Sequence, residues 1–149
     1  MPKSKVVVCI RNPIDTIASW KKSFPHLSDV IFENFPKLFF DEKLISNQQR
    51  KALSVIDETD DFEIKRALLW NYLSERIYEN RDSIILIKYE DFVVNPNLEL
   101  KKIFEHFPDV KFDFPTSEIR TKRNSVSDEE ICKIKKVCSK AASDFNYHL

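Results

Sequence analysis

An arginine and a serine near the start of the chain have the residue types and the spacing to hold a phosphate group. In VVVCIRNPIDTIASW, residues 6–20, Arg11 follows an apolar run and Ser19 comes eight positions later, on the polar side of an expected helix. A guanidinium supplies a charged, forked set of donors, and a hydroxyl adds a neutral donor. The pair could therefore share one anion. The residues alone also allow an Arg11–Asp15 ion pair beside a solvated serine.

The elements that must position these residues predict an α/β fold with a short parallel sheet flanked by helices. The continuous apolar run Lys5–Ile10 is typical of a strand buried on both faces, and Ser83–Lys88 (SIILIK) predicts a second buried strand. Helical stretches separate and follow the two strands, which is the order expected for parallel pairing. Ligands of such sheets bind beyond the carboxyl ends of the strands, and Arg11 lies at such an end.

Local signals set the expected helix boundaries. Asn12-Pro13 and Asn95-Pro96 each combine an N-cap residue with a proline suited to the first helical position. Ser127-x-x-Glu130 is a capping box for a last helix. Asp61–Asn80 carries a broad apolar face at helical spacing. The irregular stretch 25–60 is expected to contain short helices at Asp29–Phe35 and Glu42–Ile56, and it reads equally well as an acceptor-side lid or as a plain packed insertion.

Composition excludes several classes of function. The chain has 149 residues, and Lys+Arg 24 balances Asp+Glu 24, so bulk nucleic-acid or membrane binding is not expected. Glycine is absent, which excludes a glycine-rich phosphate loop of the Walker or dinucleotide-binding type. Cys9, Cys132 and Cys138 lack metal-ligand spacing, so no metal is expected. Three free cysteines and no visible signal peptide favour a cytoplasmic, reducing location.

The stretch around Arg11 resembles the 3′-phosphate-binding segment of sulfotransferases that use 3′-phosphoadenosine 5′-phosphosulfate (PAPS). In that family a buried strand ends in Arg-[Asn/Asp]-Pro, and a serine eight residues after the arginine shares the 3′-phosphate of the cofactor. Arg11 and Ser19 match these two positions. The resemblance implies a P-loop-NTPase-like sulfotransferase fold, with PAPS or its product PAP bound and no metal.

A second stretch, IILIKYEDFVVNPNLELKKIFEHF at 84–107, resembles the strand, Tyr-Glu-Asp and following helix of the same family. The resemblance gives Tyr89 a contact with the adenine region, although an aromatic filler at a strand end is equally compatible with the residues. The basic loop Arg120, Lys122 and Arg123 stands where relatives close a glycine-containing loop on the 3′-phosphate. Here only its charge and location carry over.

The departures from the family pattern leave no residue assigned to catalysis. The family's 5′-phosphosulfate loop and its catalytic histidine belong upstream of the arginine motif, whereas His26, His106 and His148 all lie downstream of it. We therefore expect residues 1–149 to form one partial sulfotransferase-like domain, lacking its N-terminal catalytic segment. Its expected partners are the nucleotide and an unknown hydroxyl or amine acceptor; a complementary N-terminal segment or a second copy of the chain also stays open.

Two other hypotheses remain. The chain could be a catalytically inactive nucleotide-binding or protein-interaction module on a sulfotransferase scaffold. It could also be a nucleotide kinase-like relative, for which the absence of glycine leaves little support.

Overall fold

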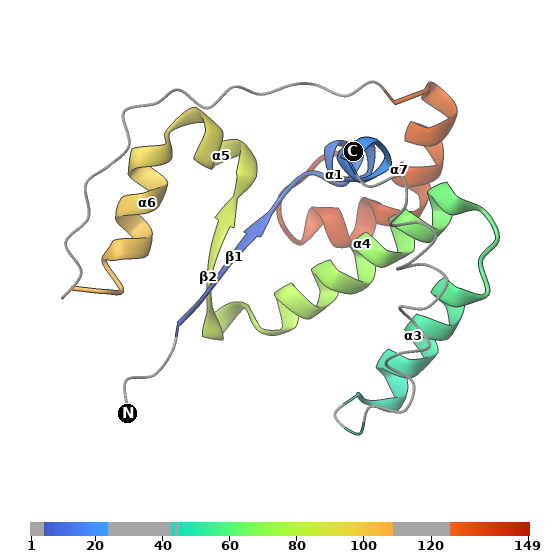
Figure 1. Cartoon of the computed structure of the whole chain (residues 1–149), viewed down its shortest axis with the longest axis horizontal. Helices are drawn as coiled ribbons and strands as arrows, with labels where there is room; N and C mark the ends of the chain where they lie inside the picture. Colours follow the sequence, from blue (N-terminus) through green and yellow to red (C-terminus); the bar gives the residue numbers. More distant parts are fainter. Residues whose placement is uncertain (1–4, 24–42, 44, 109–125) are drawn as a thin grey trace. The chain divides into compact units, whose positions relative to one another are not determined.

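The computed structural model describes residues 5–23, 43, 45–108 and 126–149 (Figure 1). The fold is helix-rich and contains a short parallel sheet of two strands, which confirms the expected α/β class at that level. The chain divides into two compact units. One, the sheet unit, comprises Met1–Arg11 and Ile77–Arg123; the other, the helical unit, comprises Asn12–Arg76 and Asn124–Leu149.

The sheet unit is built on strands β1 (Val6–Ile10) and β2 (Ile84–Lys88), which run parallel (Figure 1). Their register pairs Val6 with Ile84 and continues without a bulge to Ile10 with Lys88. Both strands therefore end at the same level of the sheet. A short 3₁₀ turn, η1 (Arg81–Ser83), precedes β2. Helices α5 (Tyr89–Val94) and α6 (Pro96–Phe104) follow β2.

Burial along the strands differs from the expectation. Ile10 in β1 and Ile85 and Ile87 in β2 are buried, but Val6 is 54% exposed and Val7 is 42% exposed. The prediction that β1 is buried on both faces is therefore wrong. Among the described residues β1 pairs only with β2, and a sheet of two strands has little with which to cover two faces. An apolar run indicates that a strand can be buried. It does not show whether neighbouring strands or helices are there to cover it.

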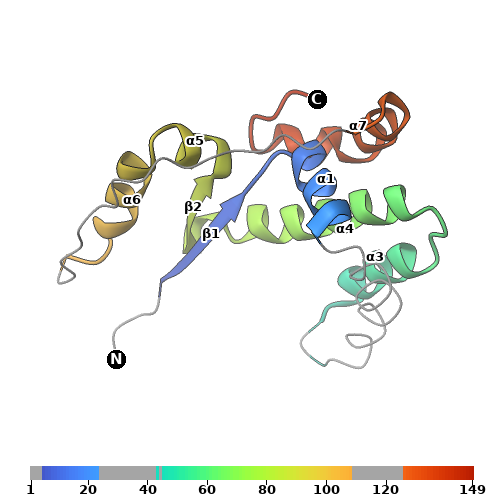
Figure 2. The same cartoon turned by 45° about the horizontal axis from the view of Figure 1, so that its top comes forward.

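The helical unit contains α1 (Pro13–Ser23), α3 (Asn47–Asp57), α7 (Asp128–Ser143) and most of α4 (Phe62–Glu79), whose last turn from Ile77 belongs to the sheet unit. Helices α1, α4 and α7 lie together in both ribbon views (Figures 1 and 2). The Asn71 amide on α4 donates to the Val137 carbonyl on α7 at 2.7 Å. The fully or nearly fully buried side chains of this unit include Ile17, Leu53, Ala67, Trp70, Ile134, Cys138 and Ala142.

The helix starts follow the capping residues. Asn12 Oδ1 accepts from the Ile14 N–H at 2.9 Å, where α1 begins at Pro13. Asn95 Oδ1 accepts from Leu98 N–H at the start of α6. Ser127 and Glu130 form the predicted capping box of α7. Each cap satisfies an N–H that lacks a partner within its own helix, so these starts are set locally.

Two further expectations concern short helices. The piece expected at 42–56 is α3, which begins at Asn47 behind a capping box of Ser46 and Gln49. The piece expected at 29–35 lies outside the described residues. In contrast, the sequence motifs predict no helix between the second strand and Asn95, and the structure shows helix α5 there. Six residues are too few for helical periodicity to stand out.

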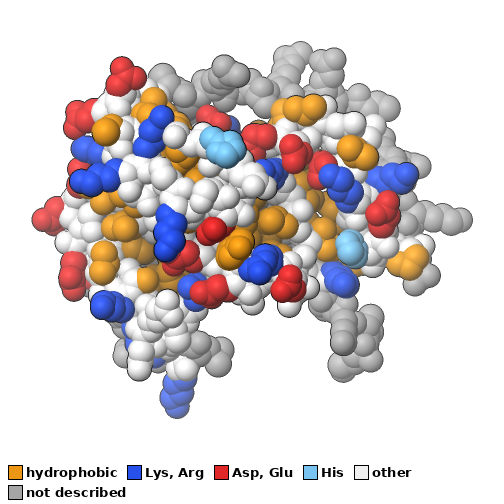
Figure 3. Space-filling view, turned by 180° about the vertical axis from the view of Figure 1, so that it is seen from behind, with side chains coloured by type: hydrophobic (Ala, Val, Ile, Leu, Met, Phe, Trp, Pro, Cys, Tyr) orange, Lys and Arg blue, Asp and Glu red, His pale blue; other side chains and the backbone are white. Residues whose placement is uncertain are grey.

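The surface carries charges of both signs. Figure 3 shows Lys and Arg side chains interspersed with Asp and Glu side chains on the face drawn. This distribution agrees with the balanced composition of the chain. No helix among the described residues has the length and apolar character that a membrane span requires.

Candidate functional site

The strongest functional geometry in the sheet unit lies at the carboxyl ends of the two strands. Arg11 follows Ile10, the last residue of β1, and Tyr89 follows Lys88, the last residue of β2. Because Ile10 pairs with Lys88, the register brings the next residue of each strand to the same edge. There the Arg11 Cζ atom lies over the Tyr89 ring, 4.4 Å from its centroid. This distance is well inside the range of a cation–π interaction.

Two further side chains act electrostatically at this edge. The pKa of the Cys9 thiol is raised, first by partial burial and then by the Glu90 carboxylate, while the Arg11 guanidinium acts in the opposite direction. A negative charge disfavours the thiolate and a positive charge favours it. Cys9, Arg11 and Glu90 therefore form one electrostatic neighbourhood. Cys9 is exposed, although the strand that contains it was expected to be buried on both faces.

Ser19 belongs to the helical unit, where it lies half-buried on α1. The first turn of α1 is held by Asn12, whose carbonyl accepts from the Thr16 hydroxyl at 2.8 Å. The structure thus confirms the strand–cap–helix order that carries the two motif residues. Arg11 and Ser19 fall in different units, so their convergence on one anion stays a prediction.

The structure describes only some of the remaining predicted site residues. Arg120, Lys122 and Arg123 lie outside the described residues, as does His26. His106 lies just beyond α6 and His148 beyond α7, and both are exposed. Among the residues that the structure describes, no group of three or more His, Cys, Asp or Glu side chains could hold a metal ion.

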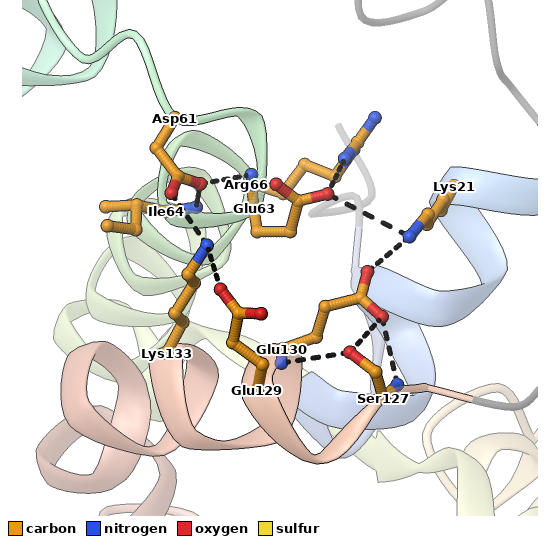
Figure 4. A network of polar contacts seen from close by, with 9 residues as sticks. All are labelled: Lys21, Asp61, Glu63, Ile64, Arg66, Ser127, Glu129, Glu130 and Lys133. Carbon is orange, nitrogen blue, oxygen red and sulfur yellow. Dashed lines mark hydrogen bonds and ion pairs between the residues drawn. The ribbon is translucent and has the colours of Figure 1, made fainter.

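A network of charged side chains in the helical unit was not anticipated from the sequence (Figure 4). Lys21 on α1 contacts the Glu130 carboxylate on α7 and lies 3.9 Å from Glu63 on α4. Beside it, Lys133 on α7 donates to Asp61, just before α4, at 2.9 Å. These contacts connect three helices that are distant in sequence.

The network changes the ionisation of its carboxylates. The Lys21 ammonium and the Ser127 N–H hold the pKa of Glu130 at about 2. The Lys133 ammonium and the Ile64 N–H likewise lower the pKa of Asp61, and Asp61 in turn raises the pKa of Lys133. Only the capping box was a readable signal here. No local sequence pattern predicts the contacts of Lys21, because the packing of the helices determines which carboxylates it meets.

Comparison with known proteins decides the family. The family model described as "Sulfotransferase domain" matches residues 1–142. The chain belongs to the sulfotransferase family. No curated protein and no solved structure matches it.

Membership of the sulfotransferase family has general consequences for function. Sulfotransferases of this family transfer a sulfuryl group to an acceptor and generally use PAPS as the donor. A nucleotide co-substrate and an acceptor are therefore implied as partners. The family match covers both stretches on which the resemblance was based, residues 6–20 and 84–107.

Proposed function

We propose that the chain carries the 3′-phosphate-binding half of a PAPS site, for sulfuryl transfer to a hydroxyl or amine acceptor. The observation that carries the proposal is the Arg11–Tyr89 pair at the carboxyl edge of the parallel sheet. This edge is where ligands of α/β sheets bind. An arginine there supplies a permanent positive charge, and a tyrosine supplies an aromatic surface.

The donor set fits the 3′-phosphate end of the nucleotide. A guanidinium remains charged throughout the physiological pH range and can bind phosphate oxygens through two parallel N–H donors. An aromatic ring at the same edge fits the neighbourhood of an adenosine. Arg11 would hold the phosphate. Tyr89 would lie beside the bound adenosine, either against the adenine, as the family resemblance implies, or against the Arg11 guanidinium that lies over its ring.

Residues from other parts of the chain complete the proposed site. The Ser19 hydroxyl would share the 3′-phosphate with Arg11, and Arg120, Lys122 and Arg123 would close over it as a basic loop. Residues 25–60 would line the acceptor side. The proposal places all of them on a P-loop-NTPase-like sulfotransferase fold within one domain over residues 1–149.

The chemistry constrains what these residues do. In sulfuryl transfer the acceptor oxygen or nitrogen forms a bond to sulfur while the bond from sulfur to the bridging phosphate oxygen breaks, and the acceptor loses a proton. PAPS supplies the sulfuryl group when bound. Arg11 and Ser19 act away from the breaking bond, so their contribution is to bind and orient the nucleotide. We assign no catalytic residue in this chain.

Thermal unfolding with added PAP tests the proposal. A ligand that binds only the folded protein raises its melting temperature, so millimolar PAP should stabilise the wild type. Arg11→Ala should abolish the shift. Arg81→Ala is the matched control, since Arg81 also lies over a tyrosine ring, at 4.3 Å from the centroid of Tyr78, in the same unit. It should keep the shift. No stabilisation of the wild type, or equal losses in both variants, would contradict the proposal.

A nucleotide-binding module without catalysis is the second candidate. It is supported by the order of residues along the chain: His26, His106 and His148 all follow the arginine motif, whereas the catalytic histidine of the family precedes it. Incubation with PAPS labelled in its sulfuryl group separates the two candidates. Label transferred to a phenol, alcohol, amine or carbohydrate acceptor supports the enzyme. PAP binding without transfer to any of them supports the module.

A further inference from the structure

The Arg11 guanidinium already covers one face of the Tyr89 ring. The Arg11 Cζ atom lies over the ring at 4.4 Å from its centroid. A nucleobase stacked on that face would have to displace the guanidinium. The face that holds Arg11 is therefore committed to the arginine, and this changes what the tyrosine is expected to do.

The contact between Arg11 and Tyr89 depends on the sheet. Two other arginines lie over tyrosine rings, Arg76 over Tyr72 at 5.6 Å and Arg81 over Tyr78 at 4.3 Å. In those pairs the partners are three or four residues apart, a spacing at which one helical stretch brings side chains together. Arg11 and Tyr89 come from different strands, and the Ile10–Lys88 pairing brings them to one edge. Their contact is a consequence of the tertiary fold.

We infer that Tyr89 is a positioning residue, whose ring holds the Arg11 guanidinium in place for the 3′-phosphate; this role rests on the function proposed above. A guanidinium stacks through its face and donates through its edge, so a ring beneath it is compatible with phosphate binding in its plane. A free arginine side chain has about 2 kcal/mol of rotamer entropy to lose on binding. A ring that restricts the side chain beforehand removes part of that cost.

Tyr89 variants separate this role from an adenine contact. Tyr89→Leu removes the ring, Tyr89→Phe keeps the ring without the hydroxyl, and Tyr78→Leu removes the ring under Arg81 as the matched control. Dissociation constants would be measured for PAP, which is adenosine 3′,5′-bisphosphate, and for adenosine 5′-phosphate, which lacks the 3′-phosphate. Melting temperatures of all variants would check that they fold.

We expect Tyr89→Leu to weaken binding of the bisphosphate about tenfold, the size of a cation–π interaction of about 1.4 kcal/mol. Binding of adenosine 5′-phosphate should change less than about twofold. Tyr89→Phe and Tyr78→Leu should resemble the wild type with both ligands. An equal loss for the two ligands in Tyr89→Leu would overturn the inference in favour of an adenine contact. A loss in Tyr89→Phe as large as that in Tyr89→Leu would overturn it in favour of a hydrogen bond from the hydroxyl.

A measurement without ligand keeps this test distinct from the test of the proposed function. A ring under the guanidinium shifts the NMR signals of the Arg11 side chain upfield, and Arg11→Lys assigns those signals. The upfield shift should persist in Tyr89→Phe and vanish in Tyr89→Leu. Its absence from the wild type would overturn the inference. If the wild type shows the upfield shift but does not bind the bisphosphate, the proposed function would be overturned instead. Phosphate binding would then no longer explain why the two residues are paired.

Discussion

Two lysines of the helical unit and Arg11 of the sheet unit are held in different ways. In the helical unit Lys21 lies between Glu63 and Glu130, and Lys133 lies between Asp61 and Glu129 (Figure 4). In the sheet unit Arg11 lies over an aromatic face. A carboxylate compensates the charge of its partner, whereas a tyrosine ring orients a cation and adds no formal charge. The first arrangement is suited to joining helices, and the second is suited to presenting an arginine to an anion.

Helix α7 and strand β1 also differ in how fully they bury their apolar side chains. In α7, Ile134 and Cys138 are 0% exposed, whereas in β1, Val6 is 54% exposed and Cys9 is also exposed. The inner face of α7 is therefore closed, while β1 leaves apolar side chains accessible.

The largest effect is expected for thiol reactivity. Burial raises the pKa of Cys138 to about 12, so only about one molecule in 10⁴ carries the reactive thiolate at about pH 8. With iodoacetamide under native conditions, the exposed Cys132 should be alkylated at least about 10³ times faster than Cys138. Cys9 is also exposed, but its pKa is raised, so it should react more slowly than Cys132. Cys132 serves as the control within the same helix. Mass spectrometry of tryptic peptides would follow each site, and labelling of Cys138 in step with Cys132 would show that the core around α7 opens readily.

The next largest effect is expected when apolar side chains are truncated, because the loss of unfolding free energy should differ between α7 and β1. Ile134→Ala removes a fully buried side chain and should lower the free energy of unfolding by about 2–5 kcal/mol. Val6→Ala, at a side chain that is 54% exposed, should cost about 1 kcal/mol or less. Denaturant unfolding monitored by circular dichroism measures both. A Val6→Ala cost as large as that of Ile134→Ala would mean that β1 is covered in solution, as its sequence predicted.

Features that depend on residues close together in the chain could be predicted from the sequence. The starts of α1, α6 and α7 could be predicted because Asn12, Asn95 and Ser127 act on N–H groups two or three residues away. Helix α4 could be predicted because its apolar period extends over 18 residues. In these cases all the information lies within one segment.

Other features depend on which segments meet. The exposure of Val6 depends on how many strands flank β1, and the Lys21–Glu130 contact depends on the packing of α1 on α7. The sequence also pointed to Arg11 and Tyr89 separately, through two motifs. Their contact follows from the Ile10–Lys88 register, which no motif encodes.

A smaller effect is expected from acid. The pKa of Glu130 is about 2 in the folded protein against an ordinary value of 4.5, so its contribution to stability is complete above about pH 4.5 and is lost as the pH falls towards 2. Solvent screening limits that contribution to about 1 kcal/mol. Glu130→Gln, which keeps an oxygen for the capping box, should lose this amount at pH 7 and nothing near pH 2.

The control for the acid prediction is Glu129→Gln, one residue earlier on α7. Glu129 is far more exposed than Glu130 and contacts Lys133 at 3.2 Å. Its replacement should change the unfolding free energy by less than about 0.5 kcal/mol at either pH. Urea unfolding at several pH values measures both variants. Indistinguishable pH profiles for the two would show that the Lys21 contact does not stabilise the helical unit.

The smallest effect should be the same in both units. Ser127→Ala removes the 3.3 Å contact of its hydroxyl with the Glu130 N–H, and Asn95→Ala removes the 3.2 Å contact of its amide with the Leu98 N–H. Both caps are exposed, so each loss should be about 0.5 kcal/mol, at the low end for N-caps. Asn97→Ala, inside α6, is the control that alters no cap. Native-state hydrogen exchange of the first-turn amides of α6 and α7 resolves each helix by itself.

Cap energies come from local geometry, so equal losses are expected even though Ile134 and Val6 respond so differently. A much larger loss at Ser127 would mean that its capping box is coupled through Glu130 to Lys21, and that even this local signal draws strength from the packing of the helical unit.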